Sequence, residues 1–124
     1  MTKKIILVTI LTFSVISWCN GQDKDERTKF FPKIELSVEN VPNKENLWVF
    51  ILAGQSNMAG RGLVEPQDTV PNKRVYSLNK KGDIIFAKEP LHFYEPSMAG
   101  LDSGLSFGKV LIGQIPDSIS VLLI

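Results

Sequence analysis

The side chain best placed to do chemistry is Ser56, which lies in the polar segment Gly54-Gln55-Ser56-Asn57 directly after the apolar run 47–53. A hydroxyl placed just past the carboxyl end of a core strand sits where open α/β sheets bind ligands. If Met58 and Ala59 begin a short helix, its first N–H groups point toward Ser56 and favour negative charge there. This arrangement predicts a nucleophilic serine that attacks an acyl group.

Such a serine needs partners, because its hydroxyl is a weak nucleophile until a positioned base takes the proton. Acyl transfer also needs hydrogen-bond donors around the developing oxyanion. Without these groups, Ser56 has a second interpretation as a capping serine in a strand-to-helix turn. The segment is not the Gly-x-Ser-x-Gly elbow of α/β-hydrolases, because Met58 occupies the position of the second glycine. The single histidine, His92, follows Glu89 at an Asp-x-x-His-like spacing and is a candidate base.

The elements that must position Ser56 predict an α/β fold with a parallel sheet. Residues 47–53 form a hydrophobic run typical of a strand that is buried on both faces. A helix is expected to begin at 102–104 and to end at Ile115, and a second buried strand follows at 119–124. A helix between two buried strands favours a right-handed βαβ crossover.

Peripheral elements are predicted around this unit. Residues 34–38 alternate apolar and polar side chains, as in a half-buried edge strand. Residues 74–78 and 83–87 flank a four-residue loop in which Gly82 supplies a positive φ, which predicts a β-hairpin outside the main sheet. The loop 90–96 is rich in aromatic residues, of which Phe93 and Tyr94 either stack on a ligand ring or pack within the protein.

The N-terminus has the pattern of a targeting segment. Two lysines precede an apolar run at 5–16, and the small residues Cys19 and Gly21 follow. This pattern is typical of a secretory signal peptide, and it is too short and wrongly flanked for a membrane-spanning helix. We therefore predict a cleaved leader, 1–21, and a secreted or periplasmic protein with no stable membrane insertion. The alternative is a lipoprotein anchored at Cys19, which the bulky Trp18 before it fits poorly.

Charge and cysteine content exclude other classes of function. The 124 residues carry fourteen basic and thirteen acidic side chains. Without the two leader lysines, twelve basic and thirteen acidic residues remain, a net charge of −1 that gives no electrostatic case for a nucleic-acid partner. The single cysteine lies in the predicted leader, so the mature domain forms no internal disulfide.

Two stretches of the chain resemble one family of esterases. The string Val49–Gly62 resembles the first sequence block of the sialate O-acetylesterase and acetyl xylan esterase group, carbohydrate esterase family six of the SGNH hydrolase superfamily. The stretch Glu89–His92, followed by 100–108, is similar to a second block in which a glycine-rich turn leads into a Gly-Leu-Ser-Phe-Ala helix. Here a glycine replaces the usual alanine at the end of that block, and Asp102 stands where a glycine is common.

The resemblance implies a three-layer α/β/α sandwich, hydrolysis of O-acetyl esters on carbohydrates, and no metal or organic cofactor. Ser56 matches the nucleophile, and its backbone N–H matches one oxyanion donor. Gly104 matches a second donor, or is instead a glycine kept for helix–sheet packing. His92 falls in a loop where family members do not carry the base, so it is assigned to loop packing or weak substrate contact. The base itself and a further oxyanion donor are expected beyond Ile124.

These observations predict three parts: the leader 1–21, a linker with an edge strand at 22–46, and the N-terminal part of the esterase domain at 47–124, truncated after its second core strand. We expect a serine esterase that removes O-acetyl groups from sialic acid, xylan or related glycans, and we expect this fragment to be inactive alone. The alternative is a non-catalytic carbohydrate-binding or surface module on an esterase-like scaffold. A truncated product without function is a third possibility.

Overall fold

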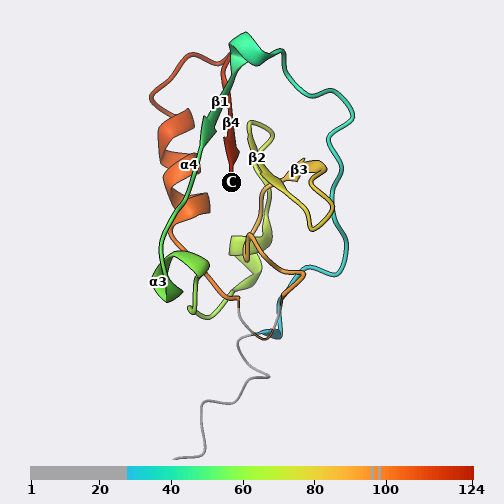
Figure 1. The fold of residues 1–124 in the computed structure, drawn as a ribbon, viewed down its shortest axis with the longest axis vertical. Coiled ribbons are helices and arrows are strands. Elements are labelled where there is room, and N and C mark those ends of the chain that lie inside the picture. Colours follow the sequence, from blue (N-terminus) through green and yellow to red (C-terminus); the bar gives the residue numbers. More distant parts are fainter. Residues whose placement is uncertain (1–27, 96, 98) are drawn as a thin grey trace, which may run out of the picture.

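The computed structural model describes residues 28–95, 97 and 99–124 (Figure 1). The predicted leader, 1–21, lies outside the described residues. In chain order the elements are η1 (Lys44–Asn46), β1 (Leu47–Phe50), α3 (Ser56–Ala59), η2 (Pro66–Thr69), β2 (Val75–Leu78), β3 (Ile84–Phe86), α4 (Gly104–Ile112) and β4 (Ser120–Leu123). Strands and helices share the chain, as the predicted α/β class requires.

The four strands form one sheet in the order β1-β4-β2-β3. Strand β4 pairs in parallel with both β1 and β2, whereas β3 pairs antiparallel with β2. The predicted parallel pairing of the strand before Ser56 with the last strand is therefore confirmed. The predicted parallel sheet is present in β1, β4 and β2, but the sheet as a whole is mixed because β3 pairs antiparallel with β2 at one edge.

The predicted β-hairpin is present, but its place in the sheet differs from the prediction. Strands β2 and β3 flank a loop in which Gly82 has a φ of +88°. The Asn79 side chain accepts hydrogen bonds from the N–H groups of Lys81 and Asp83, both at 2.9 Å, which closes the loop. The hairpin is not an excursion, since β2 lies between β4 and β3. This pairing to β4 buries Val75, Tyr76 and Ser77.

Strand β1 is shorter and more exposed than predicted. It ends at Phe50, and the exposed fractions of Trp48, Val49 and Ile51 are 43%, 52% and 78%. The expectation of a strand buried on both faces is wrong, because β1 lies at an edge of the described sheet and is partly covered on the side of Phe50. Parallel pairing nevertheless continues past β1, since the Leu52 N–H donates to the Ile124 carbonyl at 2.6 Å.

The segment predicted as an edge strand, 34–38, lies along the edge of the sheet without forming a strand. It makes a single antiparallel bridge from Ser37 to Ile85, and the Phe86 N–H donates to the Leu36 carbonyl at 2.9 Å. Ile34 is 71% exposed. The alternating pattern therefore places the segment correctly beside β3, but too little apolar surface is buried to extend the pairing.

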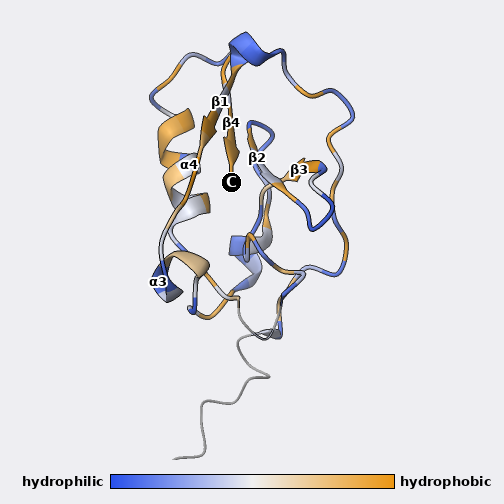
Figure 2. Ribbon diagram, viewed as in Figure 1, coloured by the Kyte–Doolittle hydropathy of each residue, from blue (hydrophilic) through white to orange (hydrophobic). Residues whose placement is uncertain are grey.

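Helix α4 packs against the sheet and forms the core with it. The helix begins at Gly104 as expected and ends at Ile112, three residues before the predicted Ile115. At Gly108 an added Cβ would lie 2.9 Å from Val75 Cγ1, so this glycine permits the close approach of helix and sheet. Figure 2 shows the apolar residues gathered on β1, β4 and the adjacent part of α4. The buried cluster consists of Val75, Ala87, Leu91, Leu105, Ile112, Val121 and Leu123.

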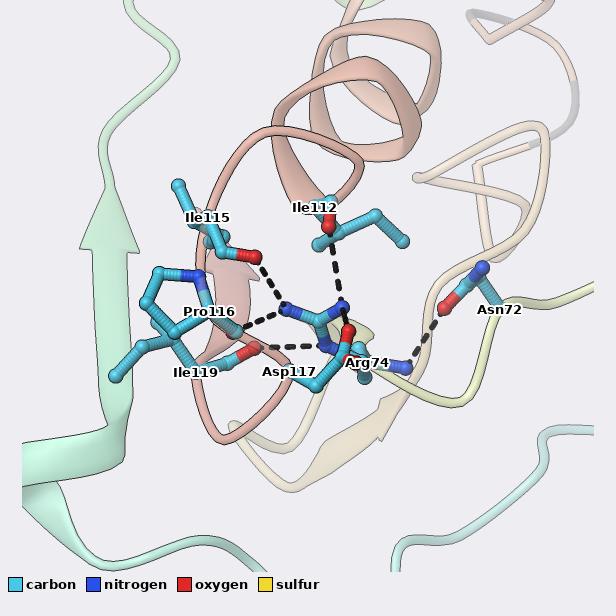
Figure 3. A network of polar contacts seen from close by, with 7 residues as sticks. All are labelled: Asn72, Arg74, Ile112, Ile115, Pro116, Asp117 and Ile119. Atoms are coloured by element: carbon cyan, nitrogen blue, oxygen red, sulfur yellow. Dashed lines mark hydrogen bonds and ion pairs between the residues drawn. The ribbon is translucent and has the colours of Figure 1, made fainter.

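Arg74, directly before β2, ties the exit of α4 to the sheet (Figure 3). The guanidinium donates to the backbone carbonyls of Ile112, Ile115, Pro116 and Ile119. Ile112 is the last residue of α4, and the last carbonyls of a helix have no partner within the helix, so the bond to Ile112 satisfies one of these groups. The guanidinium also pairs with the Asp117 carboxylate at 2.9 Å, but Asp117 is fully exposed.

We expect Arg74→Met to lower the free energy of unfolding by about 2–4 kcal/mol, because several part-buried carbonyls lose a charged donor at once. Asp117→Ala is the matched control. It removes only the exposed ion pair, and exposed pairs contribute little. Urea unfolding of both variants measures the difference. Equal losses would mean that the ion pair, rather than the carbonyl bonds, carries the stabilisation.

Candidate functional site

Ser56 is the first residue of α3, beyond the carboxyl end of β1, and its side chain is exposed. The N–H groups of Met58 and Ala59 donate to the Gln55 carbonyl at 2.9 and 3.0 Å, which closes the predicted strand-to-helix turn. Gln55, not Ser56, occupies the N-cap position. The interpretation of Ser56 as a capping serine is therefore not supported, and its hydroxyl faces solvent.

A glycine contact joins the two sequence blocks that carry the family resemblance. Gly62 and Leu101 form an antiparallel bridge, with N–H to carbonyl distances of 3.2 and 3.0 Å. Gly60 has a φ of +75°, and an added Cβ there would meet the backbone of Gly100 and Leu101. Because a side chain at Gly60 has no room, the chain after Ser56 can lie directly against the turn that opens α4.

A pocket of about 380 Å³ opens beside this contact. Gly54 and Met58, which lie two residues before and after Ser56 in the chain, line the pocket. Ser56 itself is not among the lining residues. The pocket therefore combines residues from the Ser56 turn, the β2–β3 hairpin, the aromatic loop and the end of β4. The full lining is Leu52, Gly54, Met58, Ala59, Ser77, Leu78, Asn79, Leu91, His92, Tyr94, Asp102, Leu123 and Ile124.

Gly104, the second candidate oxyanion donor, is buried at the start of α4. Its N–H donates to Asp102 Oδ1 at 2.6 Å. An added Cβ at Gly104 would lie 2.5 Å from Leu52 Cδ1 and 2.8 Å from Leu91 Cδ1. The geometry therefore supports the packing interpretation of this glycine, and its use as an oxyanion donor requires Asp102 to release the N–H.

His92 lines the pocket, but its hydrogen bond is with a neighbour in the same loop. Its Nδ1 lies 3.2 Å from the Tyr94 hydroxyl, and the two rings meet edge to face with centroids 5.9 Å apart. Phe93 also meets Tyr94 edge to face, at 6.3 Å. These contacts fit the packing role predicted for the aromatic loop, and they do not bring His92 to Ser56.

Asp102 is a part-buried acid at the wall of the pocket. Burial raises the pKa of its carboxyl, while hydrogen bonds from the Gly104 and Leu105 backbone and the nearby His92 act in the opposite direction. A carboxylate that accepts backbone N–H groups keeps its charge more readily than one that is merely buried. Asp102 thus fixes the backbone at the start of α4 and presents an acid to the pocket.

Glu89 is the one buried acid at this site that the sequence pattern did not single out as functional. It is 1% exposed, and its Oε2 accepts a bond from the Asp102 N–H at 3.4 Å. Burial and the nearby Asp102 raise the pKa of Glu89 to about 8. Its Oε1 is buried without a hydrogen-bond partner among the described residues. The signal available in the sequence was its place in the second family-like block, next to Pro90-Leu91.

The described residues also bear on two other classes of site. No three His, Cys, Asp or Glu side chains among them are grouped so as to hold a metal ion. Within the same part of the chain, no helix has both the length and the apolar character needed to span a membrane.

The comparison with protein families decides the assignment. Residues 46–124, more than half of the chain, match the family described as carbohydrate esterase, sialic acid-specific acetylesterase. The chain belongs to this family. Neither the curated proteins nor the solved structures gave a significant match.

Membership of the carbohydrate esterase family confirms the resemblance seen in the two sequence blocks. The matched range includes Ser56, Glu89, His92, Asp102 and Gly104, and it also includes every residue that lines the pocket. At the level of the family, the chain is a carbohydrate esterase-like hydrolase, and an acetylated carbohydrate is the class of substrate that the family implies.

Proposed function

We propose that the chain forms part of a serine esterase that removes O-acetyl groups from carbohydrates such as sialic acid or xylan. One observation carries the proposal: an exposed serine hydroxyl follows β1 and is flanked in the chain by two pocket-lining residues, Gly54 and Met58. Membership of the carbohydrate esterase family supports the acetylated substrate. We further propose export of the protein through the leader 1–21 and a complete domain that is a three-layer sandwich.

In the proposed reaction, Ser56 Oγ attacks the carbonyl carbon of the acetyl group while a base takes its proton. The bond from that carbon to the sugar oxygen breaks, and the sugar leaves with a proton. Water then cleaves the acetyl-serine to acetate and restores the hydroxyl. The Ser56 N–H, at the first position of α3, is free of an intrahelical partner and is the proposed donor to the oxyanion.

The base is the missing group in the described part of the chain, since the hydrogen bond of His92 is with Tyr94. The proposal therefore requires a base supplied by residues other than those described. The lack of a base for Ser56 among the described residues favours the second candidate function, a carbohydrate-binding module that keeps the pocket and performs no hydrolysis.

The test compares acetate release with glycan binding in the complete gene product. We expect acetate release from acetylated sialic acid or acetyl xylan, and we expect the 124-residue chain alone to release acetate no faster than buffer. The control is the same glycan after chemical deacetylation, which should yield no acetate. Glycan binding by the complete product without acetate release would support the binding module and refute the esterase.

A further inference from the structure

We propose that Glu89 is a positioning residue of the esterase site, which holds the turn 102–104 against the pocket through the backbone of Asp102. This inference rests on the proposed function for its effect on catalysis, but not for its structural part. It begins from the burial of the side chain, which is 1% exposed although glutamate is among the residues least often buried.

Two consecutive hydrogen bonds, here called the relay, connect the buried Glu89 side chain to the pocket wall through Asp102. Glu89 Oε2 accepts the Asp102 N–H at 3.4 Å, and Asp102 Oδ1 in turn accepts the Gly104 N–H at 2.6 Å. Asp102 itself lines the pocket. Loss of the inner bond would therefore free the backbone of the turn, and with it the wall that faces the Ser56 segment.

The surroundings of Glu89 favour the neutral acid. The charged groups that act on it are Asp102 from the turn, Asp68 from η2 and Lys109 from α4. Two of the three are acidic, and no ion pair with Lys109 is formed. A buried carboxylate without a paired cation is strongly disfavoured, so the proton stays on the side chain at neutral pH. The pKa of about 8 agrees with this geometry.

Ionisation of Glu89 therefore links the relay to pH. Its pKa in the folded chain is raised above the ordinary value of 4.5, so the folded state binds more protons than the unfolded state between pH 4.5 and about 8. The contribution of Glu89 to stability is present in full below pH 4.5 and is lost as the pH rises through 8. Above that pH, a charged Glu89 repels the Asp102 carboxylate.

The experiment follows the amide signals of Asp102 and Gly104 by NMR, together with the unfolding temperature and kcat of the complete gene product, from pH 5 to 9.5. In the wild type we expect both amides to shift together with a midpoint near pH 8 and the unfolding temperature to fall over the same range. In Glu89→Gln, a neutral side chain of the same shape, both changes should disappear and kcat should stay close to the wild-type value.

The apolar variant Glu89→Leu removes the acceptor of the Asp102 N–H. We expect it to lower kcat by about 10²-fold, since displacement of a site wall by an ångström has effects of this size. If Glu89→Leu does not fold, the Glu89→Gln comparison still decides. Amides that do not titrate in the wild type, or that titrate equally in Glu89→Gln, would overturn the proposal. If the wild type shows the titration but releases no acetate, the relay stands and the esterase function fails.

Discussion

Replacement of Ser56 by alanine is expected to lower kcat for acetyl-ester hydrolysis by about 10⁴-fold or more in the complete gene product, because the variant removes the attacking oxygen. Stability should change by no more than about 0.5 kcal/mol, because the Ser56 side chain is exposed and caps no helix. Steady-state acetate release and thermal unfolding measure the two effects. This combination separates loss of a nucleophile from loss of the fold.

Ser103→Ala is the matched control for Ser56→Ala. Ser103 is also exposed, and its Oγ lies 3.8 Å from the sulfur of Met58. Ser103 is therefore a serine close to the turn that carries Ser56, but it does not occupy the position after β1 that is proposed for the nucleophile. We expect its kcat to stay close to that of the wild type. Full activity in Ser56→Ala would remove Ser56 from the mechanism. An equally large loss in Ser103→Ala would show that the assay reports damage to the turn rather than the nucleophile.

The second large effect is expected at Gly60. Gly60→Ala should lower the free energy of unfolding by about 3–5 kcal/mol, because two costs combine. The residue has a φ of +75°, which disfavours any side chain, and its Cβ would meet the backbone of Gly100 and Leu101. Backbone atoms cannot move aside as a flexible side chain does, so the contact between the Ser56 segment and the α4 turn must open.

Gly82→Ala provides the comparison that isolates the steric part of this cost. Gly82 has a similar φ, +88°, but nothing lies within 4 Å of the Cβ that would be added. We expect a loss of only about 1 kcal/mol there. Urea titrations of the two variants give the difference directly. If both variants lose the same free energy, close packing at Gly60 contributes nothing and the glycine contact does not hold the site together.

Local patterns were sufficient for the elements that carry Ser56. The hydrophobic run, the glycine, the serine and the short helix are consecutive in the chain, so their arrangement depends mainly on neighbouring residues. The same is true of the β2–β3 hairpin, where Gly82 and Asn79 determine the loop. The start of α4 at Gly104 also lies within the range 102–104 at which the sequence predicted a helix to begin.

Features that depend on distant partners could not be predicted in this way. The position of β2 between β4 and β3 arises from pairing between Val75 and Val121, which no local pattern records. The exposure of β1 follows from its place at the sheet edge rather than from its composition. The sequence placed Glu89 in the second family-like block but did not indicate its burial, which depends on distant segments such as those that contribute Asp68 and Asp102.

The strand order also determines when the sheet can assemble as the chain leaves the ribosome. Strands β2 and β3 are neighbours in both sequence and space, so this hairpin can pair early. Strand β1 and the second side of β2 both wait for β4, which is the last element to be synthesised among those described. Until then their apolar residues and open backbone groups stay uncovered, and surfaces of this kind promote association between incomplete chains.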